Sequence, residues 1–287
     1  MTAQAIHTEI AYRRMAEADL PTAQSLSQAM RWPHRLEDWH FVYRLGTGFV
    51  AEMDGTVIGT ALCWKQGGGH GTLGMIIVSA DHQGKGIGRK LMNLVLDALG
   101  SDCCVRLIAT PAGQPLYETL GFEAVGTIHQ HQGIVKSMAC IPPALAECIR
   151  LASRKDTASI VALANLATGT AREDVIHNLL QVAEVAVLEI NGELAGFSIM
   201  RRFGRGHVVG PVVAPNEESA KALIAYWSDA YAGSFVRVDV IGDCGLSAWL
   251  TDAGLPQVDT GLLMEKNRQQ RNGKSARQFA IANQALC

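Results

Sequence analysis

Three glycines at alternate positions, Gly84, Gly86 and Gly88, form the strongest chemical pattern in the sequence. They follow the apolar run Met75–Val78, typical of a buried strand, and precede an amphipathic run typical of a helix. Glycine lets the chain turn tightly and lets backbone N–H groups approach an anion, and a helix N-terminus adds partial positive charge. The pattern therefore indicates a pyrophosphate-binding turn, although a tight connection without a ligand would have the same composition.

Two common nucleotide-binding motifs do not fit this turn. A nucleoside triphosphate loop needs Ser or Thr at a fixed place to hold magnesium, and none follows Gly88-Arg89-Lys90. A dinucleotide fold needs its glycines after the first strand and an acid at the end of the second. Here several strands are expected before the turn, and Val105–Ala109 carries no acid. Both motifs are therefore excluded.

What remains is the pattern Gln/Arg-x-x-Gly-x-Gly/Ala, with Gln83, Gly86 and Gly88 at its fixed positions. A second motif, Pro115-Leu116-Tyr117-Glu118-Thr119-Leu120-Gly121-Phe122, follows at the expected separation. Together the two motifs closely resemble the GCN5-related N-acetyltransferase (GNAT) family, and the resemblance is best over residues 10–125. It implies an N-acetyltransferase that uses acetyl-CoA as cosubstrate and no metal.

The resemblance also implies roles for individual residues. Main-chain groups of Ile76, Ile77 and Val78 would pair with the pantetheine arm of acetyl-CoA. The turn would hold the cofactor's pyrophosphate, with contacts from Gln83, Gly84, Lys85, Gly86, Ile87, Gly88 and Arg89. A backbone N–H near Ile77 or Val78 would polarise the thioester carbonyl while the amine attacks directly in a ternary complex.

Tyr117 would protonate the departing thiolate. A phenol suits this task because its ordinary pKa of about 10 lies within roughly two units of a thiol's value near 8.5. A half-buried aromatic that packs its helix on the sheet is the alternative interpretation, because aromatics on amphipathic helices are mostly core residues.

The sequence departs from the family pattern in two places. Many members carry an Asn before the tyrosine helix, where this chain has Ala109-Thr110-Pro111-Ala112-Gly113-Gln114. A catalytic glutamate is missing from Val105–Ala109, which offers only Arg106. The general base is therefore left open between a water chain, Glu52 and His131.

Aromatic and histidine side chains gather where the family binds its acceptor. Trp32, His34 and Trp39 lie between the first expected helix and the hairpin, and His131 lies near the end of the first domain. We expect these four to contact the acceptor, with helix packing as the alternative for the tryptophans. His129-Gln130-His131 on a strand would place both rings on one face, but no third ligand is apparent, so we expect no metal.

A repeated hairpin sets the organisation of the chain. Phe49–Leu62 is echoed by Ala186–Ile199, with Asp-Gly and Asn-Gly turns that suit a two-residue type I′ hairpin. The two turn glycines, Gly55 and Gly192, lie 192 − 55 = 137 residues apart, which is a domain length. The sequence therefore predicts two tandem GNAT-like α/β domains, each a mixed central sheet flanked by helices.

The order of expected elements repeats as well. Strand Ile10–Met15 leads into a helix after Asp19, and each hairpin is followed by a strand, a crossover helix, a strand and a short helix that ends at a glycine. These elements are expected at 74–78, 88–99, 105–109 and before Gly121, and again at 210–214, 219–231, 236–240 and before Gly254.

Ile141-Pro142-Pro143 interrupts regular structure, and the helix-like run Ala144–Leu151 is expected to begin the second half. We therefore predict a catalytic domain over 1–140 (the first copy) and a degenerate domain over 141–287 (the second copy). In the second copy, Asn216-Glu217-Glu218-Ser219-Ala220-Lys221 replaces the glycine turn, and its two carboxylates would repel a pyrophosphate. Leu250 stands in place of the tyrosine. The alternative is that this copy supplies acceptor specificity across a cleft between the domains.

Composition limits the partners. The chain has 287 residues, 48% hydrophobic, with 25 Lys and Arg against 27 Asp and Glu, so no global charge favours nucleic acid or anionic lipid. No apolar window is long enough for a membrane span, and the first residues lack a signal peptide's regions, so we expect a cytoplasmic protein. Seven cysteines without a Cys-x-x-Cys pair indicate reduced thiols.

The predicted function is acetyl transfer from acetyl-CoA to a primary amine of a small molecule. Two alternatives stay open: a non-catalytic acetyl-CoA-binding regulatory module, and a protein lysine or N-terminal acetyltransferase. The acceptor is expected to be the main partner, without nucleic acid or membrane, and a homodimer is compatible with the sequence.

Overall fold

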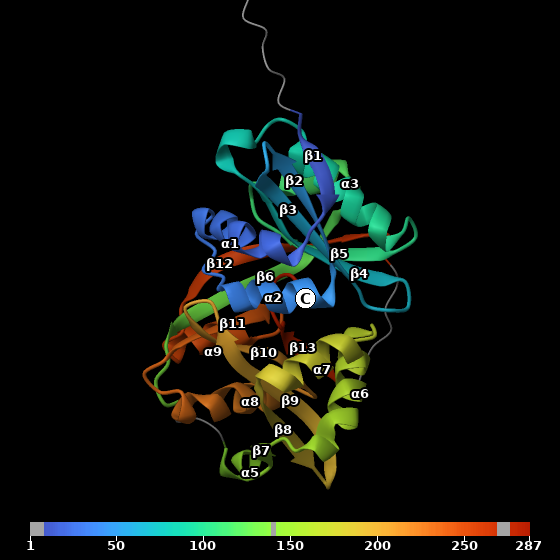
Figure 1. Cartoon of the computed structure of the whole chain (residues 1–287). Coiled ribbons are helices and arrows are strands. Elements are labelled where there is room, and N and C mark those ends of the chain that lie inside the picture. The colour runs from blue at the N-terminus through green and yellow to red at the C-terminus, as the bar shows by residue number, and fades with distance from the viewer. Residues whose placement is uncertain (1–8, 139–141, 269–275) are drawn as a thin grey trace, which may run out of the picture. The chain divides into compact units, whose positions relative to one another are not determined.

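The computed structural model describes residues 9–138, 142–268 and 276–287 (Figure 1). The chain forms two compact units. Unit 1 comprises Met1–Lys65 and Leu73–Ser101, and unit 2 comprises Gln66–Thr72 and Asp102–Cys287. Residues 102–138 of the first copy thus pack with the second copy. The predicted boundary between residues 140 and 141 lies outside the described residues.

Unit 1 is a sheet with helices. Its strands follow the order β1 (Ala11–Arg14), β2 (Thr47–Met53), β3 (Thr56–Lys65) and β4 (His70–Val78), whose first three residues belong to unit 2. The helices are α1 (Leu20–Ala29), α2 (Leu36–Leu45) and α3 (Ile87–Leu99), with short 3₁₀ turns at Glu17–Asp19 and Ala80–His82. Helix α3 packs on β2 and β3 through buried Leu91, Met92 and Val95, so the helix predicted from apolar spacing is confirmed.

Unit 2 contains most of the second copy and the end of the first. Its strands follow the order β5, β12, β6, β11, β13, β10, β9, β8, β7. Their bounds are β5 (Cys104–Ala109), β6 (Glu123–Ile134), β7 (Ile149–Leu151), β8 (Glu184–Ile190), β9 (Glu193–Phe203), β10 (Gly206–Ala214), β11 (Phe235–Ile241), β12 (Gln257–Lys266) and β13 (Arg277–Ala280). The helices are α4 (Gln114–Thr119), α5 (Pro143–Ala146), α6 (Thr157–Thr168), α7 (Glu173–Val182), α8 (Glu217–Ala230) and α9 (Leu246–Asp252), with a 3₁₀ turn at Arg154–Asp156.

Both predicted hairpin turns are confirmed. Asp54 and Gly55 have φ of 50° and 73°, and Asn191 and Gly192 have φ of 53° and 81°. Positive φ at both central residues is what a type I′ turn requires, and its twist matches that of the paired strands β2–β3 and β8–β9.

An ion network repeats at the corner where each copy begins. Arg13 on β1 pairs with Asp19 at 2.7 Å and with Glu52 at 2.5 Å. The same contacts recur in the second copy, where Arg150 pairs with Asp156 at 2.9 Å and with Glu189 at 3.1 Å. Each of these three residues lies 137 positions after its counterpart in the first copy (150 − 13, 156 − 19 and 189 − 52). The repeat seen in the hairpins therefore extends to the charged side chains that fix the first strand.

Replacing Arg13 by methionine should lower the free energy of unfolding by about 1–2 kcal/mol at pH 7, because Asp19 would lose its counter-ion while the exposed face of the network is screened by solvent. The hydrogen bond from Arg13 lowers the pKa of Asp19. A lowered carboxylate pKa stabilises the fold above the unfolded value of about 4, and that contribution is lost as pH falls further. Urea unfolding should show that Arg13→Met loses less free energy of unfolding, relative to the unmutated chain, at pH 3 than at pH 7. An equal loss at both pH values would contradict this account.

Strand β12 joins the two copies within unit 2. It belongs to the second copy, yet it lies antiparallel between β5 and β6 of the first, with Leu262 opposite both Ala109 and Thr127. Strand β6 in turn pairs with β11 of the second copy, placing His131 opposite Val238. In Figure 1 the orange β12 runs beside the green β6. The last part of the first copy therefore completes its sheet with a strand from the second.

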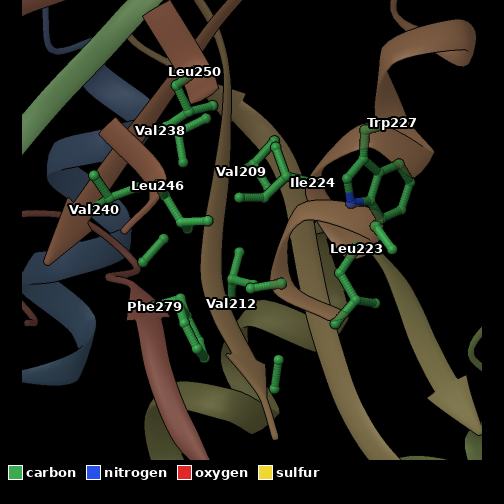
Figure 2. Close-up of a cluster of buried hydrophobic side chains, with 14 of the residues drawn as sticks. Val209, Val212, Leu223, Ile224, Trp227, Val238, Val240, Leu246, Leu250 and Phe279 are labelled. Atoms are coloured by element: carbon green, nitrogen blue, oxygen red, sulfur yellow. The ribbon is translucent and has the colours of Figure 1, made fainter. Parts of the chain in front are cut away.

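The second-copy core lies between its sheet and the two helices α8 and α9. Figure 2 shows Leu223, Ile224 and Trp227 of α8 in one cluster with strand residues. The Trp227 indole N–H donates to the Ser198 hydroxyl at 2.8 Å, so the buried ring keeps its polar atom satisfied. Helix α8 covers 217–230, close to the predicted 219–231.

The helix predicted over Ala144–Leu151 is wrong in extent. Only α5, Pro143–Ala146, is helical, and Ile149–Leu151 forms β7, with Ile149 opposite Leu188 on β8. Proline at a first helical position needs no N–H, so it can begin a short helix. The following apolar residues instead gain a ladder with β8, as β1 does with β2 in the first copy.

Candidate active site

The glycine turn lies in unit 1, between β4 and α3. Gly84 and Gly86 have φ of 76° and 78°, the left-handed region that side chains disfavour. Gly86 is the N-cap of α3, and the first helical bond runs from the Lys90 N–H to its carbonyl at 3.1 Å. The N–H groups of Ile87 and Gly88 precede that bond, so the helix itself gives them no acceptor. The turn therefore presents backbone donors at an exposed helix start.

Side chains tie this turn to the end of β4 and to the 3₁₀ turn that follows it. The Gln83 amide donates to the Val78 carbonyl at 3.0 Å, and the Lys85 ammonium donates to the Asp81 carbonyl at 3.1 Å. Gln83, a fixed position of the motif, thus sets where the turn leaves the strand. Lys85, Arg89 and Lys90 are exposed and add positive charge around the donors.

Strand β4 is kinked directly before the residues expected to pair with pantetheine. Met75 has φ of 53°, and its carbonyl accepts from the Thr60 hydroxyl at 2.7 Å. The parallel ladder with β5 covers His70, Gly71 and Thr72. Ile76, Ile77 and Val78 lie beyond that ladder, and the Ile77 side chain is buried at 3% exposure.

Tyr117 lies on α4 in unit 2 and is 7% exposed. Its ring packs edge-on to Phe122 with centroids 6.2 Å apart, and it covers Gly113 so closely that a Cβ there would lie 3.0 Å from the phenol oxygen. Burial raises the pKa of Tyr117 to about 12. The phenol is therefore neutral at physiological pH, the form that a general acid requires. The need for glycine at 113 was not predicted.

Residues at the C-terminal end of β12 hold α4, the helix that carries Tyr117. The Lys266 ammonium donates to the Leu120 carbonyl at 2.7 Å, at the C-terminal end of α4, where positive charge is favourable. Next to it, the Asn267 amide donates to the Cys103 carbonyl at 3.0 Å, and Glu265 pairs with Arg106 of β5. No spacing in the sequence pointed to these residues, because they come from the second copy.

The four acceptor candidates fall into two groups. Trp32 and His34 are half-buried in unit 1, with ring centroids 6.1 Å apart. Trp39 in the same unit is fully buried and donates to the Ser27 hydroxyl at 3.2 Å, which is the packing alternative. His131 in unit 2 is also fully buried, and its Nδ1 lies 2.8 Å from the Leu255 carbonyl. Trp39 and His131 thus offer an acceptor no exposed surface here.

Both side chains named as candidate bases have structural partners. Glu52 accepts from Arg13, and its counterpart Glu189 makes the same contact in the copy that lacks the glycine turn. This pairing therefore does not depend on catalysis. Burial lowers the pKa of His131, which favours a neutral ring, but the ring is enclosed. Of the three candidate bases, a water chain is the one to which neither the Arg13 pairing of Glu52 nor the burial of His131 is an objection.

The described residues contain no group of three His, Cys, Asp or Glu side chains placed to hold a metal ion. In this part of the chain, His129 Nδ1 instead lies 2.7 Å from the Ser247 hydroxyl. Among the same residues, no helix is long and apolar enough to cross a membrane.

The corresponding turn of the second copy is closed by its own side chains. The Asn216 side chain caps α8 by accepting from the Ser219 N–H at 2.9 Å. Glu217 pairs with Lys221 at 2.5 Å and packs against Gly245. Leu250, at the place of Tyr117, is fully buried in the apolar core.

The fold and the glycine turn define an acetyltransferase of the GNAT type. Residues 12–122 match the model of the acetyltransferase (GNAT) family, and residues 160–280 match that of an acetyltransferase (GNAT) domain. The chain therefore belongs to the GNAT acetyltransferases and carries two of these domains in tandem. The family uses acetyl-CoA.

Related proteins agree with this assignment. The chain is 24% identical over 225 residues to the uncharacterized N-acetyltransferase YitH of Bacillus subtilis, covering 75% of this chain and 76% of that one. A Pyrococcus horikoshii structure assigned as an acetyltransferase covers 100% of this chain and 99% of its own, with 16% identity and a TM-score of 0.80. A tandem GNAT protein from the clavulanic acid pathway covers 92% of this chain and 100% of its own, at 13% identity and a TM-score of 0.63. The two structures share the fold.

Proposed function

We propose that the chain is an acetyl-CoA-dependent N-acetyltransferase that works with its first copy and accepts a small primary amine. The observation that carries this proposal is the turn before α3, where Gly84 and Gly86 are left-handed and, apart from the adjoining residues of the chain, no described atom lies within 4 Å of a Cβ built on either. That open space and the helix-start N–H groups suit a pyrophosphate.

Acetyl-CoA supplies the acetyl group as a thioester. The amine nitrogen forms the new C–N bond as the C–S bond breaks, and the amine loses its proton to water. The thiolate receives a proton from Tyr117, whose phenol regains one from solvent, so that atoms and charge balance. Burial raises the pKa of Tyr117 to about 12, so the phenol keeps its proton until sulfur departs, while the pKa gap to the thiol becomes larger than for an ordinary tyrosine.

Small amines are favoured as acceptors because the side chains at the expected acceptor position, Trp32 and His34, are half-buried aromatic rings rather than carboxylates that would bind a basic peptide. The test is release of free CoA from acetyl-CoA with a library of small amines, with peptides bearing lysine or a free N-terminus as a second arm. Acetylation of the peptides but of none of the small amines would show that the acceptor is a protein amine rather than a small molecule. Binding of acetyl-CoA with no turnover in either arm would favour the regulatory module.

Replacing both Glu217 and Glu218 by alanine should leave one acetyl-CoA bound per chain. Removing the carboxylates lifts a charge repulsion but restores none of the glycine geometry, and Asn216 still caps α8. Isothermal titration calorimetry of the unmutated chain and the double variant measures this directly. Two molecules bound to the unmutated chain would contradict the degenerate second copy.

A further inference from the structure

In the second copy, the C-terminal strand β13 lies between β10 and β11 where these two strands separate. Strands β10 and β11 pair in parallel only over His207–Val209 and Val236–Val238. Beyond that ladder β13 lies antiparallel between them, with Ala280 opposite both Val212 and Val240. The Ile281 N–H continues the contact by donating to the Asp239 carbonyl at 2.9 Å.

The register of β13 matches the expected position of a cofactor arm. Aligning Gly210 with Gly74 places Val212, Val213 and Ala214 at the positions of Ile76, Ile77 and Val78, each 136 residues later. Those three first-copy residues are the ones expected to pair with pantetheine. Their second-copy counterparts are each in register with a residue of β13: Ala280, Gln278 and Arg277.

Side chains of this segment are part of the core. Phe279 is 1% exposed and lies in the cluster with Val212, Val240 and Leu246 (Figure 2). Ala280, Ile281 and Ala282 are also buried, and the Ile281 carbonyl lies where a Cβ of residue 210 would be, so Gly210 permits the close approach. The segment therefore fills the opening rather than resting on its rim.

Further contacts hold the rest of the segment. Arg201 donates to the Ala282 carbonyl at 3.3 Å. Buried Arg172 donates to the Leu286 carbonyl at 2.9 Å, and Gln66 donates to the same oxygen at 3.2 Å. The Asn283 side chain accepts from the N–H groups of Ala285 and Leu286 at 3.0 and 2.8 Å. These hydrogen bonds fix residues 282–287, whereas the side-chain nitrogen of Gln278 on β13 is buried without a hydrogen-bond partner among the described residues.

We propose that the cofactor cleft of the second copy is a peptide-strand site, and that its occupant is residues 276–287 of the same chain rather than an acyl-CoA. The comparison with pantetheine rests on the proposed function of the first copy. A tethered strand competes at an effective concentration of order millimolar, and its buried side chains and ladder hydrogen bonds add to that advantage over a free acyl-CoA. The cleft thus stays closed during the reaction cycle.

Hydrogen exchange on the unmutated, full chain tests the occupancy. The amides of Ala280 and Ile281 should exchange slowly without ligand, at rates close to those of the β10 core, and saturating acetyl-CoA should leave these rates unchanged within about twofold. Rapid exchange without ligand, or a rise of tenfold or more when acetyl-CoA is added, would overturn the proposal.

A disulfide lock gives an independent test. Val212 and Ala280 are opposed in an antiparallel pair, whose Cα separation suits a disulfide, so V212C/A280C can hold β13 in place. The reduced variant and oxidised unmutated protein are the matched controls. We expect Kd for acetyl-CoA and kcat to agree within about twofold between the oxidised and reduced variant. A tenfold loss on oxidation that reduction reverses would overturn the proposal, because β13 would then have to leave.

The two tests separate this inference from the proposed function. If the unmutated chain binds no acetyl-CoA, the proposed function fails, while exchange of the ligand-free chain still decides whether residues 276–287 occupy the cleft. If acetyl-CoA binds and β13 exchanges rapidly, only the inference fails.

Discussion

Tyr117→Phe should lower kcat by roughly 10² to 10⁴, the range for losing a positioned general acid, and should leave Kd for acetyl-CoA nearly unchanged. The phenol acts only when the thiolate departs, so cofactor binding does not depend on it. Phenylalanine fills the same space against Gly113 and Phe122, so the helix should stay packed. Steady-state kinetics and calorimetry on the same preparations separate the two quantities.

The pH dependence sharpens this experiment. Burial raises the pKa of Tyr117 to about 12, so the phenol stays protonated through the neutral range and any alkaline loss of kcat that it causes must begin above about pH 10. The phenylalanine variant should lack that loss. Its residual rate should be limited by chemistry rather than by product release, and this is checked by single-turnover measurements.

Tyr226→Phe is the matched control, because Tyr226 is a half-buried aromatic that packs beside Trp227 on α8 and has no role in the proposed chemistry. It should keep kcat within a factor of a few. If Tyr117→Phe behaves in the same way while chemistry limits the rate, Tyr117 is a packing residue and the acid must be sought elsewhere.

Gly86→Val should abolish measurable acetyl-CoA binding, with Kd raised by at least about 100-fold, while the fold survives. A branched side chain disfavours the φ of 78° at this position, at a cost of about 1–2 kcal/mol. Apart from the adjoining residues, no described atom of the chain lies within 4 Å of the new Cβ, so the group that it would obstruct is a ligand at the helix start. Gly88→Val, on the first turn of α3, should act in the same direction.

Gly55→Val separates backbone strain from cofactor contact. Gly55 has φ of 73° and equally open space around a Cβ, but it lies in the hairpin turn between β2 and β3. Both variants should lose comparable stability in thermal unfolding, and only the variant at 86 should lose binding in calorimetry. Unchanged affinity in Gly86→Val would remove the phosphate-binding assignment.

Local patterns determined much of the fold. The paired Asp-Gly and Asn-Gly turns required positive φ, and the structure has positive φ at Asp54, Gly55, Asn191 and Gly192. The apolar spacing of residues 87–99 was enough to predict α3, because its buried face needs only the 3.6-residue period. The glycine turn before α3 could also be predicted locally, because glycine tolerates the left-handed φ that Gly84 and Gly86 adopt.

Burial was only partly readable from the sequence. Trp39 and His131 were expected at the acceptor and are fully enclosed, because a residue's depth depends on which elements cover it. For Trp39, the residue type already suggested the packing alternative, because tryptophan is usually highly buried. For His131 the covering groups, including the Leu255 carbonyl, come from 124 residues further along the chain.

The tertiary structure alone decided how the two copies share strands. Strand β12 leaves the second copy to pair with β5 and β6, and so brings Lys266 to the end of the Tyr117 helix. Strand β13 fills the opening between β10 and β11. The sequence specified that these segments can be strands, but a strand's hydrogen-bonding groups are the same whichever edge they meet. The choice of partner is made by the packing of side chains that lie more than a hundred residues apart, and no local pattern carries that information.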